Sequence, residues 1–230
     1  MGAHVIPGDP PVELSLRRSG RARRISLRVS RLDGKVTLTL PTGVREAEAL
    51  AFAEERSDWI RQHLREMPAV VQVGIGTALP VDGRVRVISS GTGRRIAVSP
   101  DRITVPGSSE TVPRRLAAFL KTLARDRLAD ASDSYADVLG RRFERISLRD
   151  TRSRWGSCSS RGTLMYSWRL ILAPPEVLSY VAAHEVAHLA EMNHSPAYWA
   201  TLRRIHGPYD APRRWLRENG GDLHRYRFEA

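Results

Sequence analysis

The sequence is poor in cysteine and in long apolar runs, and each scarcity excludes a class of protein. Cys158 is the only cysteine among 230 residues, so the chain can form neither an internal disulfide nor a cysteine-rich zinc finger. Any bound metal must be held mainly by histidine or carboxylate. No window approaches the ~18 consecutive apolar residues of a membrane span. The first residues, MGAHVIPGDPPVELS, lack the basic start and apolar run of a signal peptide. We therefore predict a cytoplasmic protein that does not enter a membrane.

Lysine is also scarce, since only Lys35 and Lys121 are lysines among 37 basic residues. The formal net charge of +12 suggests nucleic acid as a partner, because clustered cations release counterions from phosphate. An excess of arginine can also reflect genome composition. The densest cluster, RRSGRARRISLRVSR at 17–31, alternates as a solvated edge strand would. A protein that binds DNA or RNA through its arginine-rich surface therefore stays an alternative function.

The hydrophobic pattern predicts an α+β protein with two structured parts. Strand-like alternation around one helix predicts a mostly antiparallel β unit in the first half. In the second half, an amphipathic helix begins near Pro113, and two strands flank the Gly/Ser-rich stretch SRWGSCSSRG, where a loop is expected. The expected parts are a disordered N-terminus at 1–11, a β-rich unit at 12–105, a linker at 106–110 and a second domain at 111–230.

The segment HEVAHLAEMNH, residues 184–194, carries three histidines and an early glutamate. From Pro175 the residues favour a helix and include no glycine, so a helix to about Met192 is expected. Within a helix, His184 and His188 lie about 40° apart around the axis and can face one ion. Glu185 lies on the flank of this face, where it can accept a proton from water as a general base.

His194 can join the other two histidines only if the helix ends before it. An uninterrupted helix would turn residue 194 about 240° away from His188. Asn193 tolerates the left-handed conformation that often ends a helix, and Ser195-Pro196 is typical of the start of the next one. The sequence therefore predicts a site of the type HExxHxxxxxH with His194 as third ligand. Glu191 is the alternative third ligand.

Three segments together resemble the YgjP-like metallopeptidases, which are relatives of the SprT-like and WLM zinc proteases. They are SRWGSCSSRG at 153–162, LILAPPEVLSYVAAHE at 170–185 and HEVAHLAEMNHSPAYW at 184–199. The resemblance implies a zincin-like second domain, Zn²⁺ held by His184, His188 and His194, and Glu185 as general base. It also implies hydrolysis of peptide bonds in a polypeptide substrate. The chain departs from the family pattern at Val186, where leucine is expected, and at Tyr198, where phenylalanine is usual.

Several features leave alternatives open. A zinc-stabilised scaffold without activity is a third possible function, although a glutamate placed as a base argues against it. The strand TLMYSWRLIL, 163–172, packs against the core or pairs with an extended substrate by strand addition. Cys158 is expected to be a small, partly buried residue rather than a redox switch. The candidates for an oxyanion donor are Tyr209, His206 and Tyr166.

Overall fold

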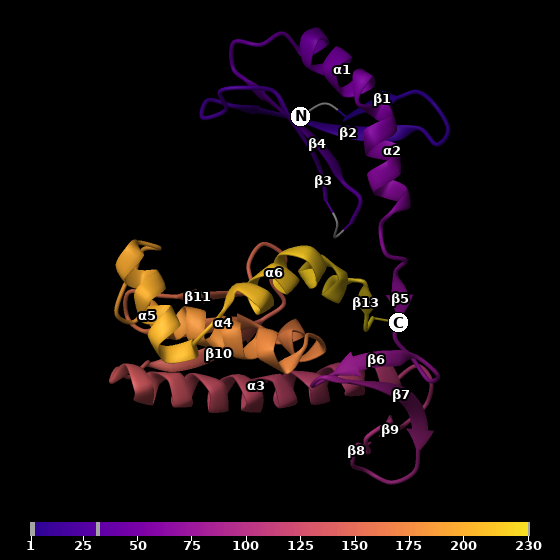
Figure 1. Ribbon diagram of the computed structural model, residues 1–230. Coiled ribbons are helices and arrows are strands. Elements are labelled where there is room, and N and C mark those ends of the chain that lie inside the picture. Colours follow the sequence, from indigo (N-terminus) through magenta and orange to yellow (C-terminus); the bar gives the residue numbers. More distant parts are fainter. Residues whose placement is uncertain (1–2, 31–32, 230) are drawn as a thin grey trace. The chain divides into compact units, whose positions relative to one another are not determined.

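The computed structural model describes residues 3–30 and 33–229, and the chain divides into two compact units, Met1–Ala69 and Val70–Ala230 (Figure 1). The fold class is α+β, as predicted. The division follows Ala69, whereas the sequence pattern placed the boundary at 106–110. The strands that lie between these points belong to the second unit, because their apolar residues are buried in its hydrophobic core. In the described part of the chain, no helix is both long and apolar enough to cross a membrane.

The first unit is a four-stranded sheet with two helices. Alternating side chains of the strands, such as Leu14, Leu38 and Leu40, are buried together with Ala49 and Ile60 of the helices. The strands lie in the order β1-β2-β4-β3, in which the central pair β2–β4 is parallel and the two outer pairs are antiparallel. The elements are β1 (Ala3–Ile6), β2 (Val12–Ser19), β3 (Ser26–Val29), β4 (Val36–Pro41), α1 (Glu46–Glu55) and α2 (Ser57–Arg65).

The N-terminal stretch 1–11 was expected to be disordered, but its described part contains strand β1. This strand pairs with β2 from Ala3 to Ile6, and the Ile6 side chain is buried. The guanidinium of Arg61 donates hydrogen bonds to the carbonyl oxygens of Pro7 and Pro10, at 2.7 and 3.2 Å. The Pro and Gly content led to the prediction of disorder. The strand forms nevertheless, because β2 supplies a hydrogen-bonding partner. Residues 1 and 2 lie outside the described residues.

The second unit opens with a short strand and a second four-stranded sheet. The sheet has the order β6-β7-β9-β8, and its inward side chains Leu79, Ile88 and Ile103 are fully buried. The outer pairs are antiparallel and the central pair β7–β9 is parallel. The strands are β5 (Val71–Gln72), β6 (Ala78–Val81), β7 (Arg84–Gly91), β8 (Ala97–Val98) and β9 (Arg102–Pro106).

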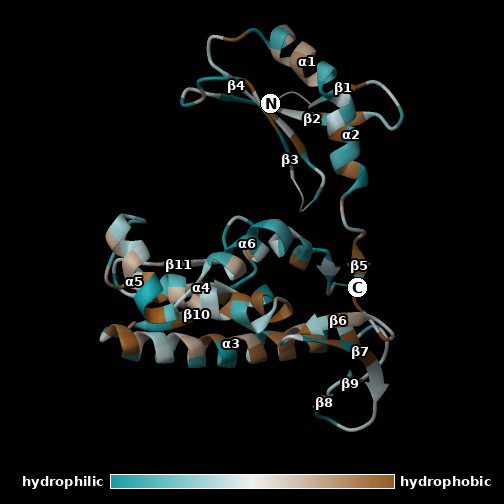
Figure 2. Cartoon of the chain, viewed as in Figure 1, coloured by the Kyte–Doolittle hydropathy of each residue, from teal (hydrophilic) through white to brown (hydrophobic). Residues whose placement is uncertain are grey.

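Two helices form the centre of the second unit. The long helix α3 (Val112–Leu139) buries a stripe at four-residue spacing, including Leu116, Leu120 and Leu128, as expected for one face of a helix. Helix α4 (Pro175–Ala187) is buried on nearly all sides, and Figure 2 shows its hydrophobic residues close to those of α3. The hydroxyl groups of Ser132 on α3 and Tyr166 form a buried hydrogen bond of 2.9 Å. The core therefore fixes α4, which carries the first two histidines.

A three-stranded sheet beside these helices differs from the sequence prediction in two ways. It consists of β10 (Arg145–Arg149), β12 (Thr163–Ser167) and β11 (Gly156–Cys158), with β12 in the middle. Strand β11 lies in the stretch expected to be a loop. Strand β12 ends at Ser167, and a 3-10 helix, η1 (Trp168–Leu172), replaces the expected continuation. Because both edges of β12 are occupied, β12 has no edge for strand addition to a substrate, and β11 is the edge strand on that side.

The C-terminal segment closes the second unit against its own beginning. It contains α5 (Pro196–His206), α6 (Asp210–Asn219), η2 (Gly220–His224) and β13 (Tyr226–Arg227). Strand β13 pairs in parallel with β5. The buried guanidinium of Arg169 donates to the carbonyl oxygens of Leu223 and Tyr226, at 3.1 and 2.9 Å, and forms an ion pair with Asp150. This arginine therefore fastens the segment to the core.

Candidate metal centre

Helix α4 positions His184, Glu185 and His188, but it ends earlier than the sequence predicted. Its last residue is Ala187, and His188 is the C-cap. Backbone hydrogen bonds from Leu189 to Val186 and from Glu191 to Ala187 then form tight turns. The expected helix to about Met192 is therefore too long by one turn. The chain leaves the helical path directly after the second histidine.

The predicted left-handed residue at Asn193 is also wrong. Among the described non-glycine residues, only Asp82 has a positive φ. Instead, the Asn193 side chain accepts a hydrogen bond from the backbone N–H of Ser195 at 3.2 Å, and this bond shapes the turn. The Ser195 hydroxyl in turn caps α5 by accepting from the N–H of Tyr198, as predicted. The chain therefore returns His194 to the helix through turns and side-chain hydrogen bonds.

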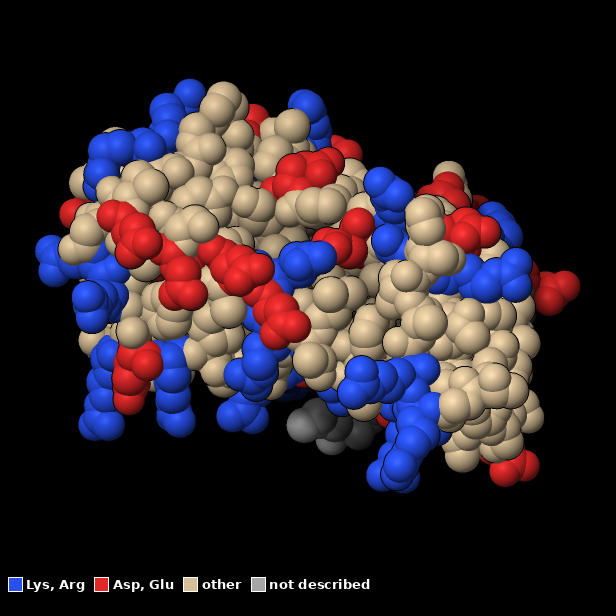
Figure 3. Space-filling view, turned by 90° about the horizontal axis from the view of Figure 1, so that it is seen from below, with Lys and Arg blue, Asp and Glu red and all other residues tan. Residues whose placement is uncertain are grey.

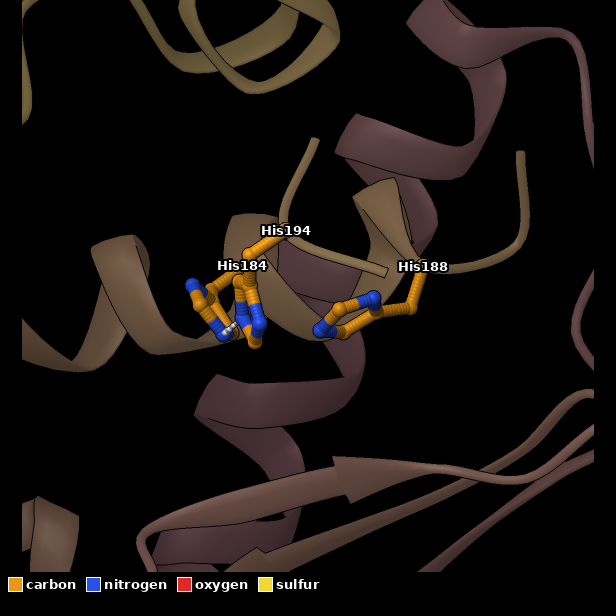
Figure 4. A group of neighbouring side chains, drawn as sticks. All are labelled: His184, His188 and His194. Atoms are coloured by element: carbon orange, nitrogen blue, oxygen red, sulfur yellow. Dashed lines mark hydrogen bonds between the residues drawn. The ribbon is translucent and has the colours of Figure 1, made fainter. Parts of the chain in front are cut away.

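The three histidines converge, as Figure 4 shows. One nitrogen from each of His184, His188 and His194 lies within 4.8 Å of the others. The Nε2 atoms of His184 and His194 are 3.1 Å apart. His188 is buried, His184 is partly buried and His194 is exposed. Three imidazole nitrogens at such separations fit the ligand shell of one metal ion, for which three protein ligands and an open fourth position are typical of a catalytic zinc site.

The surroundings of His184 and His188 favour the neutral imidazole, which is the form that binds a metal. Burial lowers the pKa of His184 to about 3, and the neighbouring His188 and His194 lower it further. Burial likewise lowers the pKa of His188. The Nδ1 atom of His188 lies 2.9 Å from the carbonyl oxygen of Glu191, so this nitrogen can donate its proton there and leave Nε2 free. Glu191 thus contacts the site through its backbone, and its carboxylate is not part of the cluster.

Tyr198 supports two of the histidines. Its hydroxyl donates to the carbonyl oxygen of His184 at 3.0 Å, and its ring stacks on the ring of His188 with centroids 4.5 Å apart. The carbonyl groups in the last turn of a helix lack partners within the helix, and the tyrosine supplies one. A phenylalanine at this position could not donate that bond. The departure from the family pattern at residue 198 therefore adds a hydrogen bond beneath the site.

Glu185 is buried beside the edge strand β11. Burial raises the pKa of its carboxyl to about 8, and the positive charge of Arg154 partly opposes this rise. Gly156 on β11 lies so close that a Cβ added there would be 2.6 Å from Cγ and 2.7 Å from Cδ of Glu185. A divalent cation on the neighbouring histidines would favour the charged carboxylate. The residues present therefore fit a metal ion with a carboxylate beside it.

Comparison with known proteins shows the family to which the sequence belongs. The sequence matches the YgjP-like metallopeptidase domain over residues 23–219. The chain belongs to the YgjP-like metallopeptidase family. A search of curated proteins gives no match. Among solved structures, the crystal structure of the metallopeptidase zymogen of Pyrococcus abyssi abylysin is similar with 21% identity and a TM-score of 0.36, and the match covers 40% of this chain and 92% of that one.

Gly156 provides a test of how this metallopeptidase holds its glutamate. With Glu185 as the expected general base, Gly156→Ala should lower kcat/KM for a peptide about 100-fold, because displacing such a group by about 1 Å can cost that much. Zinc content should stay close to wild type, since the three atoms nearest to the added methyl all belong to Glu185 and none to a histidine. Gly74→Ala is the matched control, because a Cβ there meets nothing within 4 Å. Wild-type kcat/KM in Gly156→Ala would contradict this role.

The predicted oxyanion donors occupy other places in the metallopeptidase. Tyr166 is fully buried, and its hydroxyl contacts Ser132. The rings of His206 and Tyr209 contact Tyr180, and they have no ring contact with the three histidines. The aromatic residues that do contact His184 were missed by the sequence reasoning, and they are Tyr180, Tyr198 and Trp199. Tyr180 lies four residues before His184 on α4, and Tyr198 and Trp199 lie four and five residues after His194, so all three are close to the histidines in the sequence.

Cys158 behaves as a structural residue. Burial raises the pKa of its thiol to about 11, and the negative charge of Glu185 adds to the rise. The thiol also contacts the carbonyl oxygen of Ser159 at 3.4 Å. Because the thiolate is the reactive form, this cysteine is unreactive at neutral pH. The sequence interpretation of Cys158 as a partly buried small residue agrees with this environment.

Proposed function

We propose that this protein is a zinc-dependent metallopeptidase of the HExxHxxxxxH type, with the metal held by His184, His188 and His194 in the second unit. The observation that carries the proposal is the cluster of three histidine nitrogens within 4.8 Å of one another, beside the buried carboxyl of Glu185. Neutral imidazoles with no cysteine in the cluster suit zinc. The free thiol of Cys158 supports a location in the cytoplasm.

His184, His188 and His194 would hold the zinc ion, which when bound would supply Lewis-acid chemistry, polarising the scissile carbonyl and lowering the pKa of water towards about 7. Glu185 accepts the proton of that water and later delivers it to the leaving amine. Gly156 leaves room for the Glu185 carboxylate. Tyr198 holds the carbonyl oxygen of His184, and the Glu191 carbonyl orients His188. The substrate is a polypeptide.

Metal removal tests the proposal. The chelator-treated protein should lose peptidase activity against an unfolded casein or a quenched fluorescent peptide library, because neither the histidines nor Glu185 can activate water alone. Adding one equivalent of Zn²⁺ should restore the activity, and Mg²⁺ should not, because Mg²⁺ prefers oxygen ligands. Zinc content is measured in parallel by atomic absorption. Full activity in a protein shown to be free of metal would disprove the mechanism.

One face of the molecule, seen in Figure 3, gives no support for a nucleic-acid function. Figure 3 shows one face of the molecule, where groups of Lys and Arg are interrupted by Asp and Glu side chains. Proteins that follow a single-stranded backbone use a positively charged groove with aromatic platforms. The described part of this face offers separate basic groups instead. We therefore propose only the peptidase activity.

A further inference from the structure

A polar cavity lies in the second unit. Its volume is about 440 Å³, which is in the range of small-molecule sites. Its walls come from the first half of α3, the segment after β10, η1 and the C-terminal segment around β13. None of His184, Glu185, His188 and His194 lines it. The cavity is therefore separate from the candidate metal centre, and the peptidase proposal does not explain it.

The cavity wall carries more positive than negative charge. Two carboxylates line it, Asp150 and Glu229. Asp150 is already bound by Arg169, whose Nε lies 2.6 Å from one of its oxygens. The wall has four further cations, which are Arg114, Lys121, Arg152 and Arg227.

These four cations lack carboxylate partners. Among the described residues, none of the four lies within 4.0 Å of a carboxylate oxygen. Lys121 makes only a long contact, with its Nζ 5.8 Å from the centroid of the Trp168 ring. Cations gathered at one cavity repel each other unless an anion lies between them. Among the described residues, the wall therefore carries an excess of positive charge that is not paired with carboxylates.

Burial and the positive charge of the cavity wall lower the pKa of His224, which also lines the cavity. Its side chain is 4% exposed. Burial lowers its pKa to about 4, and the positive charges of Arg169, Arg152 and Arg227 also lower it, while Asp150 opposes them. A neighbouring cation disfavours a second positive charge, so His224 stays neutral at physiological pH. The charges of Arg152 and Arg227 thus act inside the cavity as well as in solvent.

We propose that this cavity binds a small multivalent oxyanion, one that carries two or more phosphate or carboxylate groups. Arginine presents a planar fork of N–H donors that matches both groups in bidentate geometry. Arg114 and Lys121 on α3, together with Arg152 and Arg227, provide donors from three separate segments. A single monovalent anion would leave most of these cations unpaired.

Titration calorimetry of the full, zinc-loaded chain with sodium pyrophosphate at fixed ionic strength tests the site. The double variant Arg152→Gln/Arg227→Gln should bind at least about tenfold more weakly than wild type, because it loses charge-assisted hydrogen bonds. The control is Arg141→Gln/Arg142→Gln, which removes the same charge at the opposite end of α3, about 40 Å from Arg114 by helix length. This control should bind like wild type. Both double variants keep the three histidines of the metal centre. Binding of pyrophosphate to zinc would therefore be equal in the two variants and could not cause a difference in affinity between them.

A second pair keeps the test decisive if the first variant is destabilised. Arg114→Gln/Lys121→Gln changes two exposed side chains of α3, and we expect the same loss of affinity. Equal affinity in wild type and both cavity variants, or no binding of pyrophosphate or citrate to wild type, would overturn the proposal. Tighter binding of pyrophosphate than citrate identifies a phosphate ligand, and the reverse identifies a polycarboxylate. If only a single-stranded oligonucleotide binds, and all the variants weaken it equally, the charge acts as a general surface and the cavity site is refuted.

Discussion

Glu185→Gln is expected to retain zinc and lose turnover, with kcat/KM for a peptide falling about 10²- to 10⁴-fold, the usual contribution of a general base. Glutamine has the same shape as glutamate, so it fits against Gly156 without a new clash. Its amide, however, cannot accept a proton from water at neutral pH. The measurement is steady-state hydrolysis of a fluorescent peptide by protein whose zinc content has been determined.

The control for this variant is Glu176→Gln. Glu176 lies in the first turn of α4 and is exposed, so it removes the same charge from the same helix at a distance from the histidines. It should retain wild-type kcat/KM. If Glu185→Gln kept more than about a tenth of wild-type turnover with full zinc occupancy, the assigned general base would be wrong.

His194→Ala should produce the second large effect, which is on metal binding. We expect zinc affinity to fall by at least about 100-fold, because even the loss of a residue that only orients a ligand costs about 10- to 100-fold. Peptidase activity should disappear with the metal. The exposed position of His194 makes a folding defect small, so circular dichroism and thermal unfolding of the metal-free proteins should agree between variant and wild type.

Two companion variants locate the third ligand. Glu191→Gln should keep its zinc, because Glu191 contacts His188 through its backbone carbonyl and its carboxylate lies outside the cluster. His63→Ala removes a histidine from the first unit and should also keep its zinc. Full zinc occupancy in His194→Ala combined with loss of zinc in Glu191→Gln would instead assign the third ligand to the glutamate.

The arrangement of the first two histidines could be predicted from the sequence, because a helix fixes which side chains share a face. The end of that helix could not. Helix propensity continues through Leu189 and Met192, but the chain turns after Ala187, where longer-range bonds compete with the helix. The hydroxyl of Tyr198 takes the carbonyl of His184. Local propensity contains no information about such a partner.

The strand beside Glu185 was missed for a related reason. Glycine and serine are weak strand formers, so SRWGSCSSRG predicts a loop. Strand β11 forms there because β12 pairs with it, in the register Gly156 opposite Tyr166. The short strand β1 likewise forms because β2 pairs with it, and β5, which follows Ala69, pairs with β13 from the far end of the sequence. The helix that carries His184 and His188 was therefore easier to predict than the short strands, which form only when another segment pairs with them.

Because β5 pairs with β13, the second unit can be moved between proteins as a whole. The two strands pair in parallel, so the beginning and the end of the second unit lie close together, at opposite ends of a two-residue strand pair. A domain with adjacent ends can be inserted into a surface loop of a host protein without a spanning linker. A transfer of the second unit to another protein would include both the candidate metal centre and the basic cavity.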